Sequence, residues 1–320
     1  MPSNPVFQVR LARKRAEAQD ICSLELQALP GQSLPAFTAG SHIDLHLPGG
    51  LVRQYSLCSD PGDTGRYVVA VLRESASRGG SAAVHEHLEE GQEISIGAPR
   101  NQFVLHAGRP ARHVLLAGGI GITPLLAMAR QLAHEGADFA LHYCARSRER
   151  MAFADQLLAM PWSGRVRLHL DGDSGWRMAE LLSEPKSDLH LYVCGPRGFM
   201  EAALEGARAA GWSEDCLHSE FFAGDVVRRE GDADFEVEIA STGQVVGVAP
   251  GQTVVQALAG IGVQIATSCE QGVCGTCLTR VLSGRPEHRD MYLTEDEQTA
   301  CDQFLPCCSR AKSPRLVLDL

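Results

Sequence analysis

The sequence lacks the usual signs of a membrane or secreted protein. No apolar run in its 320 residues approaches the roughly 18 to 20 residues that a membrane span needs. The first residues, Met-Pro-Ser-Asn-Pro-Val-Phe, lack the charged start and apolar core of a signal peptide. The net charge of −10 leaves no basic excess, which argues against nucleic acid or an anionic membrane surface as a partner. We therefore expect a cytoplasmic protein that binds neither.

The eleven cysteines do not indicate a disulfide framework, because the cytosol keeps thiols reduced. Cys269, Cys274 and Cys277 form a C-x4-C-x2-C pattern, and Cys307 follows after 29 intervening residues. This is the ligand order of a plant-type [2Fe–2S] ferredoxin, whose cluster carries one electron at a time. The interval favours Cys307 over its neighbour Cys308 as the fourth ligand. A zinc site is the weaker interpretation, because zinc prefers two C-x2-C pairs or histidine partners.

Acidic residues are concentrated near the end of the chain. Residues 234–320 hold eleven Asp and Glu against six Lys and Arg. Such a surface suits docking to a basic patch on a redox partner, and plain solubility explains it equally well.

Three regions that differ in their pattern of apolar and turn-forming residues predict a multidomain protein. We expect an antiparallel β-barrel over residues 1–108, an α/β parallel-sheet nucleotide-binding domain over 109–223 and an α+β, β-grasp ferredoxin-like domain over 235–320. A polar linker is predicted at 224–234.

The barrel is predicted from short strands separated by Gly, Pro and Asp turns, at 6–11, 21–29, 42–47, 52–57, 67–72 and 93–96. In the middle region, strands at 113–117, 139–144, 165–170 and 189–194 alternate with helices at 124–134, 151–160, 178–182 and 198–210. The last region begins with a strand at 235–239, a hairpin partner at 245–248 and a helix at 253–260.

A glycine-rich turn marks a candidate pyridine-nucleotide site. Gly118, Gly119 and Gly121 follow a predicted strand, and Thr123 and Pro124 open the next helix. Glycines let the backbone approach a phosphate closely, and a helix N-terminus offers free N–H groups to a pyrophosphate. A tight strand-to-helix turn without a ligand is the alternative.

Two further strand ends could complete this site. Cys194, Gly195 and Pro196 follow one strand and would place a small, soft side chain against a nicotinamide. Arg146 and Ser147 follow another and could hold the adenosine ribose or its phosphate. These residues leave the choice between NADH and NADPH open.

A flavin is expected between the nucleotide and the cluster, because NAD(P)H delivers two electrons at once and the cluster accepts one. On the strand at 52–57, Arg53 could clamp a phosphate, Tyr55 could lie against the isoalloxazine and Ser56 could hydrogen-bond near its reactive nitrogen, with Gln54 beside them. Arg78 and the candidate ligands Gly79, Gly80 and Ser81 resemble an anion-binding nest at a helix start. A solvated strand with a packed tyrosine is the alternative.

In this order, the motifs resemble the phthalate dioxygenase reductase family, in which an FMN-binding barrel, a pyridine-nucleotide domain and a plant-type ferredoxin share one chain. The resemblance covers nearly the whole sequence. It rests on 53–58, 78–81, 117–124, 194–196, 218–222, the cysteine set and the ending 307–320.

The resemblance implies roles for single residues. Arg53, Gly80 and Ser81 would contact the FMN phosphate, while Tyr55 and Ser56 would contact the ring. Phe222 would cover the flavin where the nicotinamide enters, with Glu220 beside it; together with Ser56 and Cys194 these are the predicted catalytic residues. Family habit favours NADH, and a single phosphate nest favours FMN over FAD.

The predicted function is that of a monomeric reductase component that passes electrons from NADH through FMN and a [2Fe–2S] cluster to a separate terminal oxygenase. A Rieske non-haem iron enzyme acting on an aromatic acid or related small molecule is the expected acceptor. A P450 or another monooxygenase is an alternative acceptor, and a flavin and iron–sulfur redox sensor is an alternative of another class.

Overall fold

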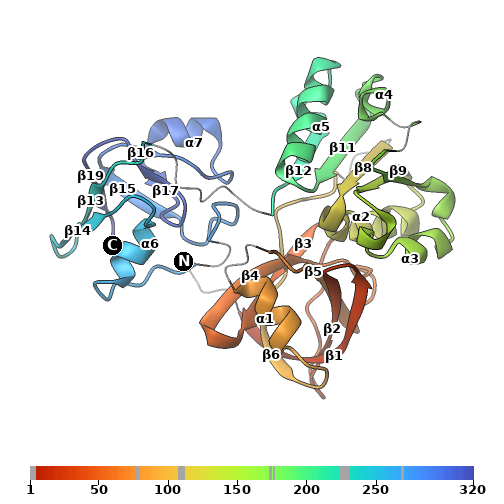
Figure 1. The fold of residues 1–320 in the computed structure, drawn as a ribbon, viewed down its shortest axis with the longest axis horizontal. Coiled ribbons are helices and arrows are strands. Elements are labelled where there is room, and N and C mark those ends of the chain that lie inside the picture. Colours follow the sequence, from red (N-terminus) through yellow and green to blue (C-terminus); the bar gives the residue numbers. More distant parts are fainter. Residues whose placement is uncertain are drawn as a thin grey trace. The chain divides into compact units, whose positions relative to one another are not determined.

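The computed structural model describes residues 5–75, 79–106, 112–172, 175, 177–222, 231–267 and 270–320. The chain divides into two compact units, Met1–Glu220 and Phe221–Leu320 (Figure 1). Most of the predicted linker, 224–230, lies outside the described residues.

The first unit begins with an antiparallel barrel. Its strands are β1 (Val6–Ala18), β2 (Ile21–Ala28), β3 (Ser41–Leu47), β4 (Leu51–Ser56), β5 (Arg66–Leu72), β6 (Glu93–Gly97) and β7 (Arg100–Asn101). They run in the order β4-β3-β6-β1-β2-β5, with β7 paired to β3. An isolated bridge between Leu57, just after β4, and Val69 of β5 joins the two outermost strands of the sheet.

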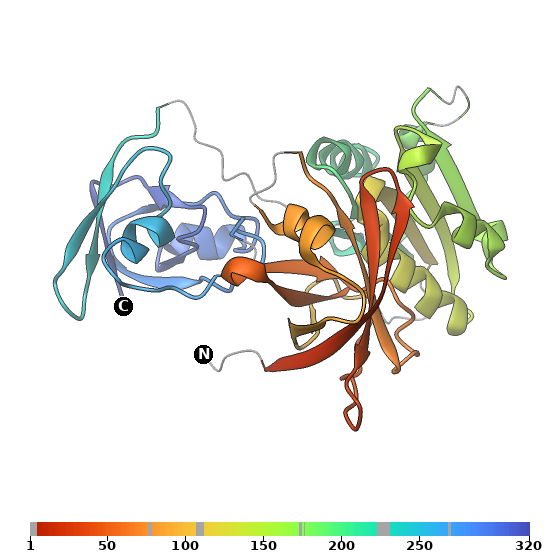
Figure 2. The same ribbon diagram turned by 60° about the horizontal axis from the view of Figure 1, so that its bottom comes forward.

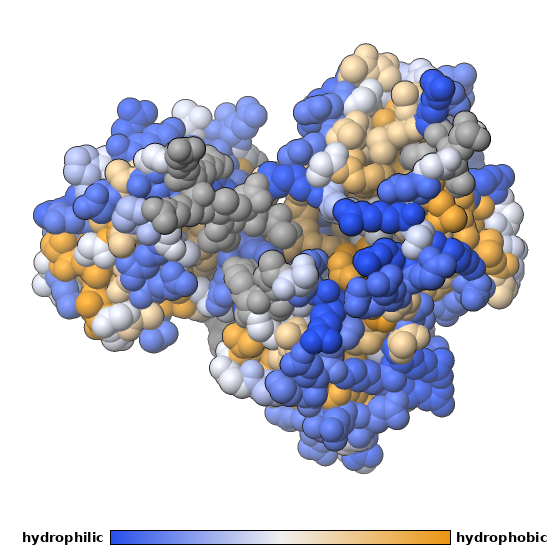
Figure 3. Space-filling view, viewed as in Figure 1, coloured by the Kyte–Doolittle hydropathy of each residue, from blue (hydrophilic) through white to orange (hydrophobic). Residues whose placement is uncertain are grey.

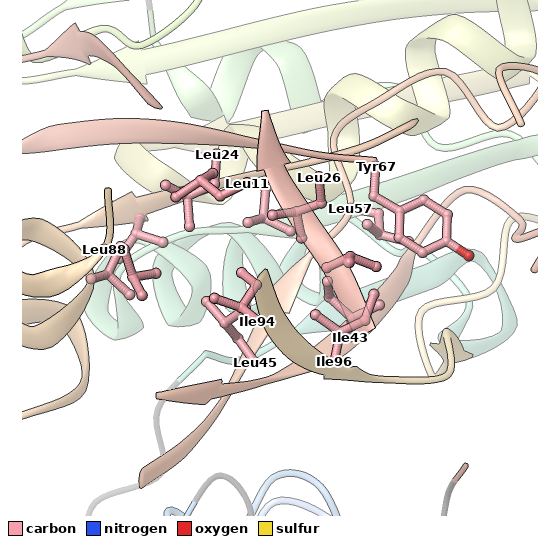
Figure 4. Close-up of a cluster of buried hydrophobic side chains, with 14 of the residues drawn as sticks. Leu11, Leu24, Leu26, Ile43, Leu45, Leu57, Tyr67, Leu88, Ile94 and Ile96 are labelled. Atoms are coloured by element: carbon pink, nitrogen blue, oxygen red, sulfur yellow. The ribbon is translucent and has the colours of Figure 1, made fainter. Parts of the chain in front are cut away.

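Alternation along the strands builds the barrel core. Leu11, Leu24, Leu26, Ile43, Leu45 and Ile96 are fully buried and point toward one another (Figure 4). Hydrophilic side chains cover most of the visible outer surface of the barrel (Figure 3). Helix α1 (Gly80–His87) packs against β3, β4 and β5 (Figure 2).

The remainder of the first unit is a parallel sheet in the order β10-β9-β8-β11-β12. Its strands are β8 (Arg112–Gly118), β9 (Asp138–Ala145), β10 (Val166–Leu170), β11 (Leu189–Cys194) and β12 (Leu217–Glu220). Its helices are α2 (Ile122–His134), α3 (Ala154–Ala159), α4 (Met178–Leu182) and α5 (Arg197–Ala209). In the described part of the chain, no helix has the length and apolarity that crossing a membrane requires.

The second unit is a small mixed sheet with two short helices. Strands β13 (Phe235–Ile239), β14 (Val245–Val248), β15 (Thr279–Ser283), β17 (Gln303–Phe304) and β19 (Arg315–Leu318) lie in the order β14-β13-β19-β15-β17. A separate pair joins β16 (Pro286–Glu287) to β18 (Arg310–Ala311). Helix α6 (Val254–Ala259) starts at a capping box of Thr253 and Gln256, and α7 (Glu295–Ala300) at one of Thr294 and Glu297.

The largest departures of the element boundaries from the predictions are in β1 and α3. Strand β1 runs to Ala18 rather than ending near Leu11, because its polar second half stays paired with β2 across two register shifts. Helix α3 starts at Ala154 rather than Met151, because Phe153 takes a left-handed conformation with φ of 60° and is buried in a turn. Strands β7, β12 and β15 to β19 and helix α7 were not predicted.

A buried ion pair fastens the start of the second unit. Arg289 makes a two-pronged contact with Asp232, and both side chains are 4% exposed. Arg310 donates to the Ala233 carbonyl at 2.9 Å. Residues 232 and 233, at the end of the predicted linker, are therefore held against the ferredoxin-like sheet.

Candidate functional site

The carboxyl ends of the parallel strands meet at one edge of the sheet. The chain proceeds from β8 outward through β9 and β10, then returns to the other side of β8 with β11 and β12. The gap between β8 and β11 is thus the topological switch point, where open α/β sheets bind ligands. Gly118 ends β8 and Cys194 ends β11, so both predicted nucleotide motifs lie at this point.

Close backbone contact at the switch point explains its glycines. A Cβ on Gly121 would lie 2.2 Å from the Cys194 carbonyl oxygen, and one on Gly195 would lie 2.9 Å from the Gly118 Cα. Side chains at either position would force the two turns apart. The structure therefore brings the two motifs together as one cradle, as a bound dinucleotide requires.

The rest of the predicted nucleotide site surrounds this cradle. Thr123 and Pro124 are buried in the first turn of α2, where the Thr123 hydroxyl donates to the Ile120 carbonyl at 3.0 Å. Arg146 is exposed just beyond the end of β9, next to β8, and Ser147 follows it. Their roles toward a ribose stay predictions.

The predicted phosphate nest is assembled on the barrel. A Cβ on Gly80 would lie 2.6 Å from the Cγ of Arg53, so the arginine side chain lies directly over the start of α1. Gly79 precedes the helix with φ of 89°, a conformation that glycine adopts freely. Ser81 accepts a hydrogen bond from the Glu74 N–H at 3.1 Å. An arginine, a glycine turn and a helix N-terminus together fit a phosphate.

Lys14 of β1 holds the other end of α1. Its Nζ donates to the carbonyls of Val84, His85 and Leu88 at 2.7 to 2.9 Å. A cation at the C-terminus satisfies carbonyls that have no helical partner and opposes the negative end of the helix dipole. Lys14 therefore anchors the helix whose N-terminus forms the predicted phosphate nest. The sequence analysis did not identify Lys14.

Tyr55 and Gln54 leave β4 on opposite faces, as alternation predicts. Tyr55 is partly buried against the barrel core, and burial raises the pKa of its hydroxyl. The Gln54 amide donates to Asp44 at 3.2 Å. Tyr55 is thus a fixed aromatic surface beside Arg53, which suits a stacked ring.

The barrel and the sheet meet at a buried carboxyl. Ser56 Oγ donates to Glu220 Oε2 at 3.3 Å, and Glu220 is the register partner of Cys194 on the neighbouring strand. Burial raises the pKa of Glu220 to about 8, partly opposed by the Ser56 hydrogen bond. Burial, with Glu220 nearby, also raises the pKa of the Cys194 thiol. Three of the four predicted catalytic residues therefore lie together.

His42 is a member of this group that sequence reasoning missed. It is the register partner of Ser56 on β3, and its Nδ1 lies 4.0 Å from Glu220 Oε1. Burial, with the charge of Arg100, lowers the pKa of His42 to about 4, so the ring is neutral at pH 7. The pairing of β3 with β4 and the unpredicted strand β12 bring His42 to the site.

Phe222 lies two residues beyond Glu220 and is half-buried. It belongs to the second unit, and its position over a flavin stays a prediction.

The cysteine motif forms a buried group in the second unit. Cys274, Cys277 and Cys307 are each at most 8% exposed, while Cys269 lies outside the described residues. A hydrogen bond to Cys307, together with burial, raises the pKa of the Cys277 thiol. Within the described ranges, no three His, Cys, Asp or Glu side chains converge on a single ion. A [2Fe–2S] cluster requires only two cysteines at each iron, so a Cys277–Cys307 pair fits it.

Two glycines shape the loop between these cysteines. Gly272 and Gly275 have φ of 75° and 70°, and a Cβ would meet Cys308 Sγ at 2.4 Å and the Tyr292 ring at 2.3 Å respectively. Cys308 packs behind Gly272 and donates to the Leu305 carbonyl at 3.6 Å. The hydrogen bond between Cys277 and Cys307 agrees with Cys307 as the fourth ligand, which stays a prediction.

Comparison with known families agrees with this geometry. The family model of the 2Fe-2S iron-sulfur cluster binding domain matches residues 237–312. The family model of the oxidoreductase NAD-binding domain matches residues 115–205. These ranges contain the cysteine motif and the glycine cradle; the exact domain boundaries stay predictions.

Full-length relatives share the whole arrangement. A vanillate O-demethylase oxidoreductase of Pseudomonas putida is 55% identical over 307 residues, covering 95% of this chain and 96% of the relative. The solved phthalate dioxygenase reductase, described as a modular structure for electron transfer from pyridine nucleotides to [2Fe–2S], is 37% identical, covers 98% of both chains and superposes with a TM-score of 0.80. An intact type IV self-sufficient cytochrome P450 monooxygenase is 39% identical over 98% of this chain and 41% of its own, with a TM-score of 0.80.

The fold and its sites define an NADH-dependent electron-transfer oxidoreductase of three domains. The chain belongs to the phthalate dioxygenase reductase family of oxygenase reductases. This membership confirms the predicted fold class and the cofactor set of FMN, a [2Fe–2S] cluster and NADH.

Replacing Gly121 by Ala tests the cradle. The new methyl group would meet the Cys194 carbonyl, so the two turns must separate and the KM for NADH should rise about tenfold or more. Steady-state ferricyanide reduction measures this constant. Gly164→Ala is the matched control, because no atom lies within 4 Å of its Cβ. An unchanged KM in Gly121→Ala would contradict a nucleotide site at the switch point.

Glu220→Gln should change the pH dependence of stability. The pKa of Glu220 in the folded chain, about 8, lies above its ordinary value of 4.5. Between these pH values the carboxyl is ionised only in the unfolded chain, so the wild-type protein loses stability as the pH rises from 4.5 to 8. Glu220→Gln has no carboxyl to titrate at this position. Between pH 4.5 and 9 its free energy of unfolding should therefore rise by on the order of 4 kcal/mol relative to that of wild type. Urea unfolding followed by tryptophan fluorescence measures it, since all three tryptophans lie in the first unit. A pH-independent difference would show that Glu220 titrates normally.

Proposed function

We propose that this chain supplies electrons from NADH to a Rieske-type non-haem iron oxygenase that acts on an aromatic acid or a related small molecule. The observation that carries the proposal is the junction of Ser56, Cys194 and Glu220, where the nucleotide cradle meets the flavin-type barrel. The similarity to a vanillate O-demethylase oxidoreductase favours an aromatic acid as the oxygenase substrate.

In this proposal the cofactors occupy the sites assembled above. Arg53, Gly79, Gly80 and Ser81 hold the FMN phosphate, and Gln54, Tyr55 and Ser56 contact its ring. The nucleotide lies along Gly118, Gly119, Gly121, Thr123, Pro124, Arg146, Ser147, Cys194, Gly195 and Pro196. Phe222 would cover the ring where the nicotinamide enters.

The bound groups supply hydride donation, conversion from two-electron to one-electron transfer, and single-electron carriage. The chain's own residues arrange this chemistry. Ser56 offers a hydroxyl at the junction, and the fully buried Val193 and Cys194 exclude water from the strand end beside it. In the second unit, Cys277 and Cys307 would hold one iron, and Cys269 and Cys274 the other.

A cytochrome P450 is the second candidate acceptor. The self-sufficient P450 monooxygenase contains a region similar to nearly the whole of this chain, which shows that this arrangement also occurs joined to a P450. A redox sensor is the third candidate, and it would not need rapid turnover with NADH. We further propose that the reductase acts as a monomer.

Reconstitution separates the candidates. The FMN- and cluster-loaded chain is mixed with NADH and either a purified Rieske aromatic-acid oxygenase or a P450, and NADH-dependent product is measured. Product with the Rieske enzyme alone supports the main proposal. Product with the P450 alone would replace it, and failure to reduce even cytochrome c would favour the sensor.

Cys307→Ser should abolish the visible iron–sulfur absorbance, whereas Cys308→Ser should leave it. Without the cluster, NADH-dependent ferricyanide reduction at the flavin persists, while reduction of the terminal oxygenase is lost. Absorbance spectra and the two activities measure these effects, and Cys308→Ser is the matched control, because both thiols are equally buried. The reverse pattern would assign the fourth ligand to Cys308.

A further inference from the structure

A buried carboxylate lies directly behind the cysteine loop of the second unit. The side chain of Asp290 is completely buried. A Cβ on Gly272, two residues before Cys274, would lie 3.0 Å from the Asp290 Cα. The N–H of Met291 donates to the Gly272 carbonyl at 2.9 Å. The segment that carries Asp290 is therefore fixed against the loop.

The same carboxylate is tied to the segment of the predicted fourth ligand. Asp290 Oδ1 accepts a hydrogen bond from the Ser309 hydroxyl at 3.1 Å, and Ser309 follows Cys307 by two residues. Ser309 Oγ in turn accepts from the Arg289 N–H at 3.1 Å, which directs the hydroxyl proton at the carboxylate. Asp290 Oδ2 accepts from the Leu293 N–H at 2.9 Å. Donors thus face both oxygens, as an ionised carboxylate requires.

The adjacent arginine is engaged elsewhere. The Arg289 guanidinium makes its two-pronged contact with Asp232 and also contacts Glu287 at 2.9 Å. It therefore does not neutralise Asp290. The basic side chain that faces Asp290 is His288, whose Nδ1 lies 3.4 Å from Oδ1 and has no hydrogen-bond partner among the described residues.

The charge of Asp290 matters because reduction of the cluster adds another. In the proposed function each electron enters the cluster from the flavin and leaves it for the terminal acceptor. While the electron is held, the cysteine loop surrounds one more negative charge. A carboxylate buried beside the loop opposes that charge, since charges in the protein interior are weakly screened. Net charge and hydrogen bonding are among the factors that set the reduction potential of an iron–sulfur cluster.

We propose that the buried negative charge of Asp290 lowers the reduction potential of the [2Fe–2S] cluster and so favours the release of each electron to the acceptor. No bond forms or breaks at Asp290 and no proton moves, while one electron arrives and one leaves. This inference rests on the proposed function for the destination of the electron. The potential itself is a property of the cofactor-loaded chain alone.

Asp290→Asn tests the charge with little change of shape. The amide can accept from the Leu293 N–H and donate to Ser309 Oγ, so both hydrogen-bonded positions stay filled. In the full-length, cofactor-loaded chain, the equilibrium constant for one-electron reduction of the cluster should rise about tenfold, which corresponds to about 59 mV. A redox titration followed by the EPR signal of the reduced cluster measures this constant.

Three further variants separate charge from packing. Asp296→Asn removes an equal charge from the exposed first turn of α7, where water and salt screen it, so the constant should stay within about twofold. Ser309→Ala removes a hydrogen bond to Asp290 but no charge, and should likewise stay within about twofold. His288→Gln removes the facing imidazole, and the rise caused by Asp290→Asn should persist in this background.

The outcomes decide between a charge effect and a structural one. An unchanged potential in Asp290→Asn, or an equal rise in Ser309→Ala or Asp296→Asn, would overturn the proposal. Disappearance of the rise in the His288→Gln background, or loss of the cluster from Asp290→Asn, would do the same. Iron content and the visible spectrum establish that each variant holds its cluster.

A separate activity distinguishes this inference from the proposed function. Ferricyanide reduction at the flavin, upstream of the cluster, should stay within about twofold in every variant. If the wild-type chain failed to reduce cytochrome c, the proposed function would be wrong, while the potentials would still decide the role of Asp290.

Discussion

The contact between Ser56 and Glu220 is the interaction on which the rest of the arrangement depends. It joins the end of a barrel strand to the end of the edge strand of the parallel sheet. Each domain alone offers half a site: a phosphate nest beside an aromatic ring, and a glycine cradle beside a buried thiol. In the proposed function, their junction is where the hydride donor meets the flavin. The buried carboxyl is costly to ionise, so it stays mostly protonated at pH 7 rather than acting as a structural charge.

Glycines that allow close contacts between neighbouring turns stabilise this junction more than reactive side chains do. Gly121 and Gly195 allow the β8 and β11 turns to touch, and Gly80 allows Arg53 to cross the start of α1. In the second unit, Gly272 and Gly275 do the same for the cysteine loop. At each position a methyl group would displace a functional neighbour. The same physical constraint therefore recurs at all three predicted cofactor sites.

Local patterns predicted what depends on local sequence. Gly118, Cys194 and the cysteine spacing pointed to the candidate sites because strand ends and ligand intervals are visible in the chain. His42 could not be predicted from the sequence, because its approach to Glu220 depends on the pairing of β3 with β4 and on the edge position of β12. Strand β12 itself has four residues, of which only Leu217 is apolar, and so shows no apolar run. Helix α7 was missed for a related reason: its sequence, Glu-Asp-Glu-Gln-Thr-Ala, has no apolar face.

The most direct test of the junction is anaerobic mixing of NADH with the FMN-loaded chain and its Ser56→Ala variant. If Ser56 lies where hydride is received, the reduction rate should fall about a hundredfold or more, since one precisely placed donor contributes on that order. The dissociation constants for FMN and NADH should stay within about threefold. A variant that is reduced as fast as wild type would show that NADH meets the flavin elsewhere.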